Sequence, residues 1–138
     1  RWRPTIEAQR LFSENLNAQA SPNEYANLLL LLALNNLQTA ESSYFARRLL
    51  EWPMRFQVNQ DLFYNLGYKD GNLPGILTTT YYAYPQNSSG PVVVVLFYRN
   101  LPQQTYRQWR RDLPHDEFAR WLLRDPQAIP AVGAALGQ

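Results

Sequence analysis

Two segments rich in β-branched and aromatic residues follow each other in the second half of the chain. They span residues 75–84 and 91–99, and the segment between them reads Pro-Gln-Asn-Ser-Ser-Gly, which is typical of a turn. This pattern predicts two strands paired as an antiparallel hairpin. The second strand contains consecutive valines and is apolar on both faces, so we expect it at the centre of its sheet with helices on both sides.

A long apolar helix is predicted to start at Pro22. Ser21 is a suitable N-cap, and Glu24, three residues after it, completes a capping box. Residues 25–34 place leucines on more than one side of this helix, which predicts that it is buried on more than one side.

A second helix is predicted to start after Thr39 and to run to about Trp52, where Pro53 would stop it. The short joint between the two helices predicts an antiparallel pair. We expect the apolar face of this second helix to carry Phe45, Leu49 and Trp52, with Arg47 and Arg48 facing water.

Weaker signals mark the shorter elements. Residues 1–20 are expected to form a loop with about one helical turn, and residues 61–66 a brief helix that Gly67 caps in the left-handed conformation. A short strand is predicted over residues 68–70, followed by a tight connection over 71–75.

The order of these elements predicts an α+β fold, a small antiparallel sheet flanked by helices. Residues 1–57 are expected to be a helical segment, and residues 58–138 a three-stranded antiparallel sheet with C-terminal helices. The helix predicted over 114–123 is expected to bury Phe118, Trp121 and Leu122.

The composition excludes several functional classes. The chain has no cysteine, and its single histidine is His115, so thiolate metal sites, histidine clusters and a Ser-His-Asp triad within these residues are excluded. No cofactor is expected. A net charge of +2 with interspersed acids and bases argues against a nucleic-acid partner. The longest apolar run, 28–34, is too short to span a bilayer.

Three other groups have ordinary structural explanations. Acidic residues follow the run Arg107–Arg111, so it is expected to be a solvated helical face with one buried tryptophan. His115 is expected to be exposed or to cap a helix start locally. The tyrosines of the first long strand, Tyr81, Tyr82 and Tyr84, are expected to form a half-buried sheet surface.

Lys69, the only lysine of the chain, lies between Tyr68 and Asp70 in a segment bounded by Gly67 and Gly71. Glycine permits close approach of a ligand to the backbone, and an ammonium beside it can bind a carboxylate or move a proton. The backbone N–H that follows such a glycine can point into a cleft as an oxyanion donor. An exposed lysine before a hairpin turn is the alternative interpretation of the same residues.

Several motifs taken together resemble the C-terminal half of the penicillin-recognising serine hydrolases, the superfamily of class A β-lactamases and D,D-peptidases. Ser21-Pro22 matches the Ser/Thr-Pro pair that begins a buried helix in that family, and Trp52 matches a tryptophan near the end of the next helix. The segment 69–71, Lys-Asp-Gly, matches its Lys-Thr/Ser-Gly strand. Two long strands and a helix from Pro114 follow in the family's order.

The resemblance implies serine-dependent acyl transfer with β-lactam or D-Ala-D-Ala-type amides as substrates. It implies a penicillin-binding hydrolase, such as a β-lactamase or a D-alanyl-D-alanine carboxypeptidase, acting on peptidoglycan in the bacterial cell envelope, periplasmic or secreted. It assigns Lys69 a catalytic role and places Asp70, Gly71 and Asn72 in the substrate-binding site. The backbone N–H of Asn72 would form half of the oxyanion hole.

The nucleophile of that chemistry is missing from these residues, because no serine is followed by a lysine three positions later. The resemblance therefore implies a Ser-x-x-Lys motif upstream of Arg1, in an N-terminal half of the same protein, and the chain alone is expected to be inactive. Two residues depart from the family pattern. Asp70 replaces a hydroxyl residue that contacts the substrate carboxylate, which weakens penicillin recognition. Arg3 lies where a deacylating glutamate is expected, which favours peptidase-like or penicillin-binding activity over efficient antibiotic hydrolysis.

Other interpretations stay open. The fold can serve as a non-catalytic module that binds a peptidoglycan or peptide ligand, which Asp70 favours; upstream Ser-x-x-Lys and Ser-x-Asn motifs would indicate an enzyme instead. The chain can also be an unrelated α+β domain with an incidental Lys-x-Gly. Because the leucine helix and the valine strand need covering, we expect association with another copy or with the N-terminal half.

Overall fold

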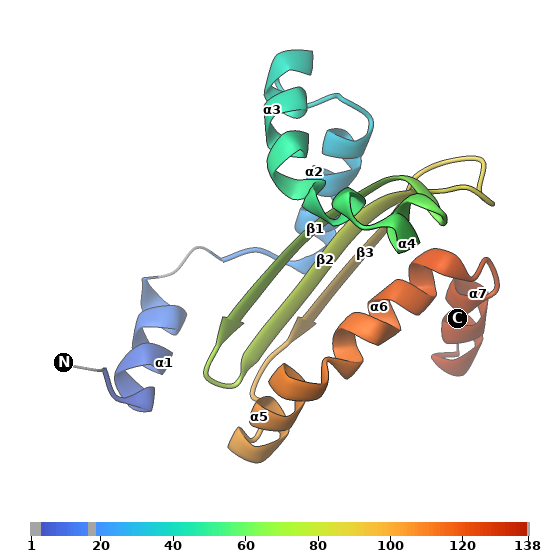
Figure 1. The fold of residues 1–138 in the computed structure, drawn as a ribbon. Helices are drawn as coiled ribbons and strands as arrows, with labels where there is room; N and C mark the ends of the chain where they lie inside the picture. The colour runs from blue at the N-terminus through green and yellow to red at the C-terminus, as the bar shows by residue number, and fades with distance from the viewer. Residues whose placement is uncertain (1–3, 17–18, 138) are drawn as a thin grey trace.

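The computed structural model describes residues 4–16 and 19–137, which form an α+β fold around a three-stranded antiparallel sheet (Figure 1). The fold class and the number of strands predicted from the sequence are confirmed. Arg3 lies outside the described residues. In chain order the elements are α1 (Ile6–Asn15), α2 (Pro22–Ala33), α3 (Ala40–Leu50), η1 (Trp52–Arg55), α4 (Gln57–Gln60), β1 (Phe63–Leu73), β2 (Ile76–Pro85), β3 (Val92–Tyr98), α5 (Gln103–Asp112), α6 (Pro114–Arg124) and α7 (Ala128–Ala135).

The sheet is a meander with the strand order β1-β2-β3, so β2 is the central strand. The expectation that the strand over 91–99 lies centrally is wrong, because none of the described residues adds a strand to its outer edge. Leu73 pairs with Ile76, and the two residues between them close the first hairpin. One of these is Gly75, whose φ of 78° a residue with a side chain rarely adopts.

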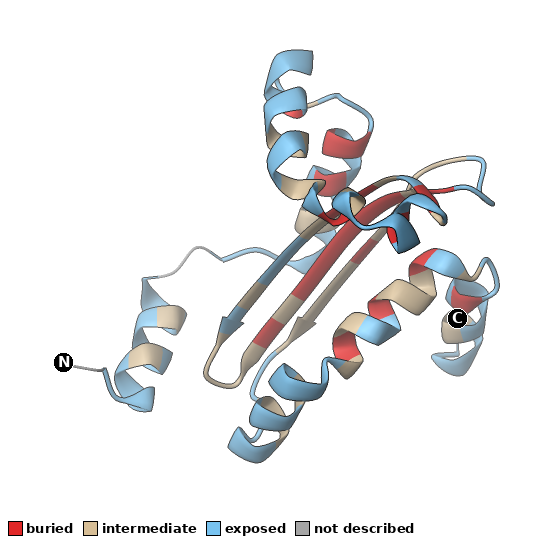
Figure 2. Ribbon diagram, viewed as in Figure 1, coloured by how far each residue is buried: buried red, intermediate tan, exposed pale blue. Residues whose placement is uncertain are grey.

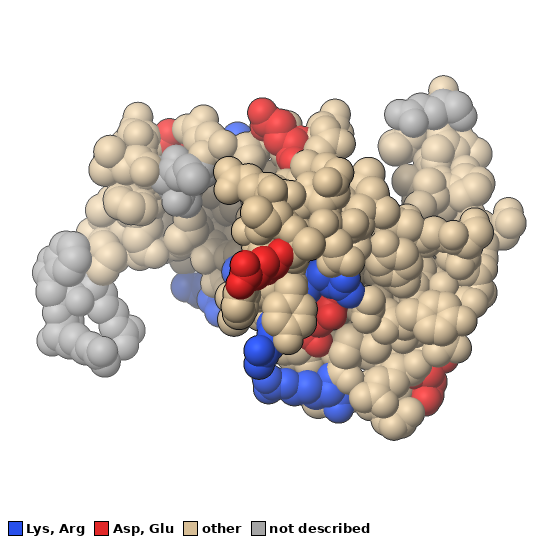
Figure 3. Space-filling model, turned by 90° about the horizontal axis from the view of Figure 1, so that it is seen from above, with Lys and Arg blue, Asp and Glu red and all other residues tan. Residues whose placement is uncertain are grey.

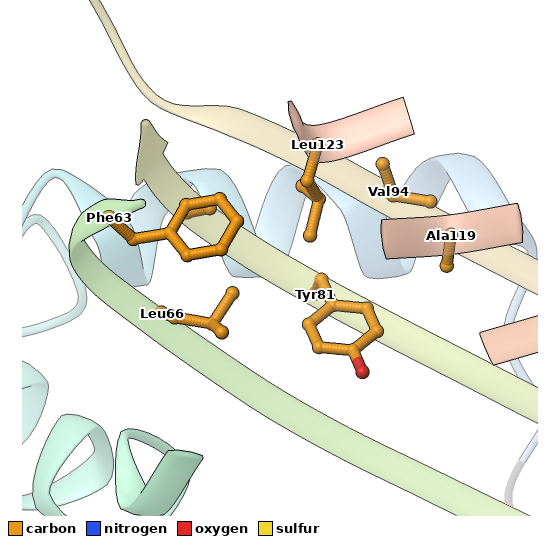
Figure 4. Packing of buried hydrophobic residues seen from close by; sticks show 7 residues of the cluster. Phe63, Leu66, Tyr81, Val94, Ala119 and Leu123 are labelled. Atoms are coloured by element: carbon orange, nitrogen blue, oxygen red, sulfur yellow. The ribbon is translucent and has the colours of Figure 1, made fainter. Parts of the chain in front are cut away.

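Helices cover both faces of the sheet and create two cores. Tyr81 and Tyr82 follow each other on β2, so their side chains point to opposite faces. Tyr82 packs against α2 together with Leu29 and Leu32, whereas the α6 side of the sheet holds a second cluster (Figures 2 and 4). The buried members of this second cluster are Phe63, Leu66, Tyr81, Ala83, Val94, Ala119 and Leu123.

The predicted starts of α2 and α3 are confirmed, and the capping hydrogen bonds explain them. The Ser21 hydroxyl accepts from the backbone N–H of Glu24 at 3.2 Å, and the Glu24 carboxylate accepts from the Ser21 N–H at 2.7 Å. Thr39 accepts from the N–H of Ser42 in the same way. Each cap satisfies an N–H that the helix cannot pair internally, a contribution of about 1 kcal/mol.

The predicted apolar face of α3 is wrong. Phe45 and Leu49 are 55% and 78% exposed, whereas Ser43 is fully buried. Arg47 was expected to face water, but its side chain is only 17% exposed because it forms an ion pair with Glu51 at 2.6 Å. The hydroxyl of Tyr82 donates to the same carboxylate at 3.0 Å, and Ala46 and Leu50 of α3 pack against the cluster that contains Tyr82.

The segment 61–66 is not the predicted helix, because the first strand already begins at Phe63. Gly67 consequently is not a left-handed cap but a residue of β1 opposite Tyr82. A methyl group added at Gly67 would lie 2.1 Å from the ring of Tyr82. The pairing with β2 therefore extends β1 well beyond the short strand predicted over 68–70.

The helices α1 and α6 also differ from the sequence-based expectation. Residues 6–15 form the helix α1, where a loop with one helical turn was expected. The buried residues of α6 are His115, Ala119 and Leu123, while Phe118 is 36% exposed. The small Ala119 lets the helix approach the sheet closely, which decides which side of α6 faces the core. The proposed division of the chain at residue 57 remains a prediction.

Candidate functional site

Lys69 lies on β1, an edge strand of the sheet, with 59% of its side chain exposed. Its ammonium group donates to the backbone carbonyl of Asp70 and lies 3.9 Å from the carboxylate of the same residue. The backbone carbonyl of Lys69 accepts from the hydroxyl of Thr80 on β2 at 2.7 Å. The strand is therefore fixed on its inner side, while the ammonium remains open to solvent.

The four residues assigned to the site from the sequence do not share one face of the sheet. Side chains alternate along a strand, so Lys69 and Gly71 belong to the face of Tyr82, and Asp70 and Asn72 belong to the opposite face. At Gly71 the missing side chain leaves room for Thr78, whose hydroxyl would lie 2.8 Å from an added methyl group. The ammonium of Lys69 and the carboxylate of Asp70 are nevertheless only 3.9 Å apart, and both side chains are exposed.

Two cavities of the described structure lie away from Lys69. One, of about 310 Å³, lies along α5 and is lined by glutamine and arginine side chains, including Arg107 and Arg111. The other, of about 160 Å³, lies between Leu62, Pro85 and Arg124. Neither of these two cavities borders the predicted site.

A polar cluster lies between the sheet and α6, on the face that carries Asp70. The hydroxyl of Tyr81 donates to the carboxylate of Asp116 at 2.6 Å, and the ring of Tyr68 lies 4.6 Å from that of Tyr81. Burial is the main reason that the pKa values of both tyrosines lie well above their ordinary value, and the nearby carboxylates add to this effect. Both phenols therefore stay protonated, and they are unsuited to act as bases.

His115, at the start of α6, is buried, although exposure or local capping was expected from the sequence. Its ring stacks on Trp109 of α5 with an interplanar angle of 7° and meets the ring of Tyr98 edge-on. Among the described residues, the Nδ1 atom of His115 and the hydroxyl of Thr79 are the buried side-chain atoms without a hydrogen-bond partner. The spacing of His115, Ala119 and Leu123 is the sequence signal that would have revealed this burial.

Protonation of His115 is expected to destabilise the fold. Burial lowers the pKa of His115 below 6.5, and the carboxylates of Asp116 and Asp70 offset only part of this effect. Below pH 6.5 the unfolded chain then binds more protons than the folded one. The free energy of unfolding therefore decreases as the pH is lowered in this range. Urea titrations between pH 7.5 and 5 should show this slope, and His115→Phe should remove it. An equal slope in both proteins would contradict the burial of a neutral imidazole.

Charge on the described surface is mixed. On the face drawn in Figure 3, basic and acidic side chains lie close to one another near the middle, and most of the remaining area carries neither. On α5, Arg111 pairs with Asp112 at 2.7 Å, and Trp109 between the arginines is half-buried. No group of three potential metal ligands is found within residues 4–16 and 19–137. The described helices include none that is long and apolar enough to cross a bilayer.

Comparison of this chain with models of protein families, with curated proteins and with solved structures finds no match.

Proposed function

We propose that this chain is the C-terminal portion of a serine acyl-transfer hydrolase that acts on β-lactam or D-Ala-D-Ala-type amides. In this proposal β1 supplies the Lys-x-Gly strand, and the serine nucleophile comes from another part of the same protein. Lys69 helps to hold the substrate carboxylate and supports proton transfer, and the N–H of Asn72 contributes to the oxyanion hole. The setting is the bacterial cell envelope.

The position of Lys69 is the observation that carries the proposal. An exposed ammonium on an edge strand can face a segment that packs against that edge, whereas a lysine on the central strand could not. The order of elements supports the same interpretation, since β1 is followed by two antiparallel strands of the same sheet and later by α6, which packs across it. This is the order that the family resemblance implies.

Asp70 supports a second candidate, a non-catalytic module that binds a peptidoglycan or peptide ligand. Its carboxylate lies 3.9 Å from the ammonium of Lys69 and reduces the positive charge that a substrate carboxylate would meet. Such a module would bind a D-Ala-D-Ala peptide in equilibrium dialysis and release no D-alanine. Release of D-alanine by the intact protein would exclude it.

Replacing Lys69 by alanine in the intact protein is expected to lower kcat/KM for a D-Ala-D-Ala-type amide by about 100-fold or more, because a proton-transfer group is lost. Lys69→Arg should keep the charge and recover substrate binding better than turnover. Arg99→Ala, which removes an exposed cation at the end of β3, is the matched control and should leave kcat/KM unchanged. Unchanged turnover in Lys69→Ala would show that the assignment of this lysine is wrong.

A further inference from the structure

The helix α5 is attached to the rest of the fold by few contacts. It connects β3 to α6, and most of its surface is exposed (Figures 1 and 2). Neither of the two core clusters includes a residue of α5. Among the described residues, its side chains form hydrogen bonds and ion pairs only with each other, as Arg111 does with Asp112. The half-buried side chains of α5 are Thr105, Tyr106 and Trp109, so its packing depends on this small group.

The ring of Trp109 makes the aromatic contacts that hold α5 against the sheet. It meets the ring of Tyr98 on β3 edge-on, with the centroids 5.1 Å apart, and it stacks on the imidazole of His115 at 6.0 Å. Because His115 also contacts Tyr98, the three rings form one cluster between β3, α5 and the start of α6. Movement of Trp109 out of this cluster would remove both contacts at once.

Both ends of α5 are suited to act as hinges. Asn100 and Leu113 flank the helix, and their φ angles of 57° and 52° lie in the left-handed region that residues with a side chain rarely adopt. Asparagine tolerates this region, but leucine is strained there. A strained backbone conformation persists only where surrounding contacts impose it, so Leu113 can relax once α5 loses its contacts.

The imidazole of His115 lies in surroundings that suit only its neutral form. The residue is 7% exposed, and its Nδ1 atom has no hydrogen-bond partner. A proton on Nδ1 would create a buried donor that has no acceptor. His115 is also the second residue of α6, where the helix dipole disfavours a cation. Protonation therefore weakens the cluster that holds α5.

The groups around this imidazole have opposing effects on its charge. Burial is the largest effect and keeps the pKa of His115 below its ordinary value, although the carboxylates of Asp116 on α6 and Asp70 on β1 favour the protonated ring. On α5, the face of Trp109 attracts a cation weakly. On β3, the phenol of Tyr98 stays neutral because burial raises its pKa, and β2 contains no charged residue. The packed cluster consequently holds the neutral imidazole.

We propose that α5 is a pH-sensitive strap, which leaves the sheet when His115 takes up a proton. Movement of Trp109 away from the imidazole gives the charged ring access to water, where Nδ1–H finds an acceptor. Asn100 and Leu113 absorb the change in direction of the chain, and the ring of Tyr98 becomes exposed at the end of β3. Release of α5 does not depend on the proposed hydrolase function.

Amide hydrogen exchange of the intact protein, followed by mass spectrometry at pH 7.5 and 5.5, is the test. Protection factors are compared, because they exclude the direct effect of pH on the chemical exchange rate. The hydrogen-bonded amides of residues 106–113 should be less protected than those of β2 at both pH values, since release of α5 needs no global unfolding. A released imidazole titrates at about pH 6.5, so the protection of α5 should fall by up to about 10-fold at pH 5.5.

Three variants assign this change to the ring cluster. His115→Phe keeps a ring that can stack on Trp109 but takes up no proton, so the protection of α5 should be equal at both pH values; His115→Gln serves if the first variant does not fold. Trp109→Ala should release α5 already at pH 7.5. Trp121→Ala truncates a half-buried tryptophan of α6 and is the matched control, which should leave α5 protected. Far-UV circular dichroism checks that each variant folds.

Four results would each overturn the proposal. The amides of α5 could exchange no faster than those of β2, which would mean that α5 opens only with the whole fold. Their protection could be independent of pH in the unmodified protein, or it could fall equally in the His115 variant, which would assign the effect to another group. Protection of α5 that survives Trp109→Ala, or is lost equally in Trp121→Ala, would show that the ring cluster does not hold the helix.

Discussion

Replacing Gly67 by alanine is expected to lower the free energy of unfolding by about 3 kcal/mol. The added methyl group would lie 2.1 Å from the ring of Tyr82, and this ring cannot move aside, because it is fully buried and its hydroxyl is bound to Glu51. Urea or guanidinium unfolding followed by circular dichroism measures the loss.

Two comparisons separate this steric cost from the general effect of removing a glycine. Gly90→Ala should change the free energy of unfolding by less than about 1 kcal/mol, since an added methyl group there meets no atom within 4 Å. In a Tyr82→Leu background, Gly67→Ala should cost much less than in the wild type, because the two sites are coupled. If Gly67→Ala is as mild as Gly90→Ala, the pairing of β1 with β2 is not as described.

Phe63→Ala is expected to lower the free energy of unfolding by about 3 to 5 kcal/mol, which approaches the whole stability of a domain of this size. Phe63 is 2% exposed and lies in the cluster between the sheet and α6, so its removal leaves a cavity. Phe12→Ala on α1 is the matched control, because that ring is 54% exposed, and it should cost less than about 1 kcal/mol. Denaturant unfolding of both variants tests the difference, and equal losses would contradict this core.

Gly67 and Phe63 also belong to a segment whose structure could not be predicted from the sequence. Local signals were sufficient where the physics is local: Ser21 and Thr39 cap helices as predicted, and the turn residues after Tyr84 separate β2 from β3. The segment from Phe63 to Gly67 has no strand pattern of its own. Its strand conformation depends on pairing with β2, a contact between distant residues that local propensity cannot represent.

The predicted buried faces of α3 and α6 were wrong for a related reason. Periodicity favours the largest apolar side chains as the buried stripe, but close packing selects small residues. Ser43 of α3 accepts a hydrogen bond from Leu37 in the joint between α2 and α3, and Ala119 of α6 lies in the cluster against the sheet. The apolar character of β3 was read correctly, while its place in the sheet was not, because that place depends on which segment supplies the next strand.

The candidate site was only partly accessible from the sequence. Lys69 was singled out by its rarity and its glycine neighbours, and it does occupy an exposed strand edge. The predicted strand over 68–70 already implied that Lys69 and Asp70 point to opposite faces, but which face each of them shares with Tyr82 followed only from the register of β1. His115 was assigned to the surface because a histidine beside a proline at a helix start usually is exposed; its burial comes from the packing of α5 and α6 against Tyr98.

The most direct test of the proposed function is to locate a covalent penicillin adduct. The intact protein would be treated with a fluorescent penicillin, digested and analysed by mass spectrometry, with Lys69→Ala treated in parallel. We predict one acylated serine, outside residues 1–138, and labelling slowed about 100-fold or more in Lys69→Ala. An intact protein that is never acylated, or an adduct on a serine of this chain that forms equally fast without Lys69, would contradict the account.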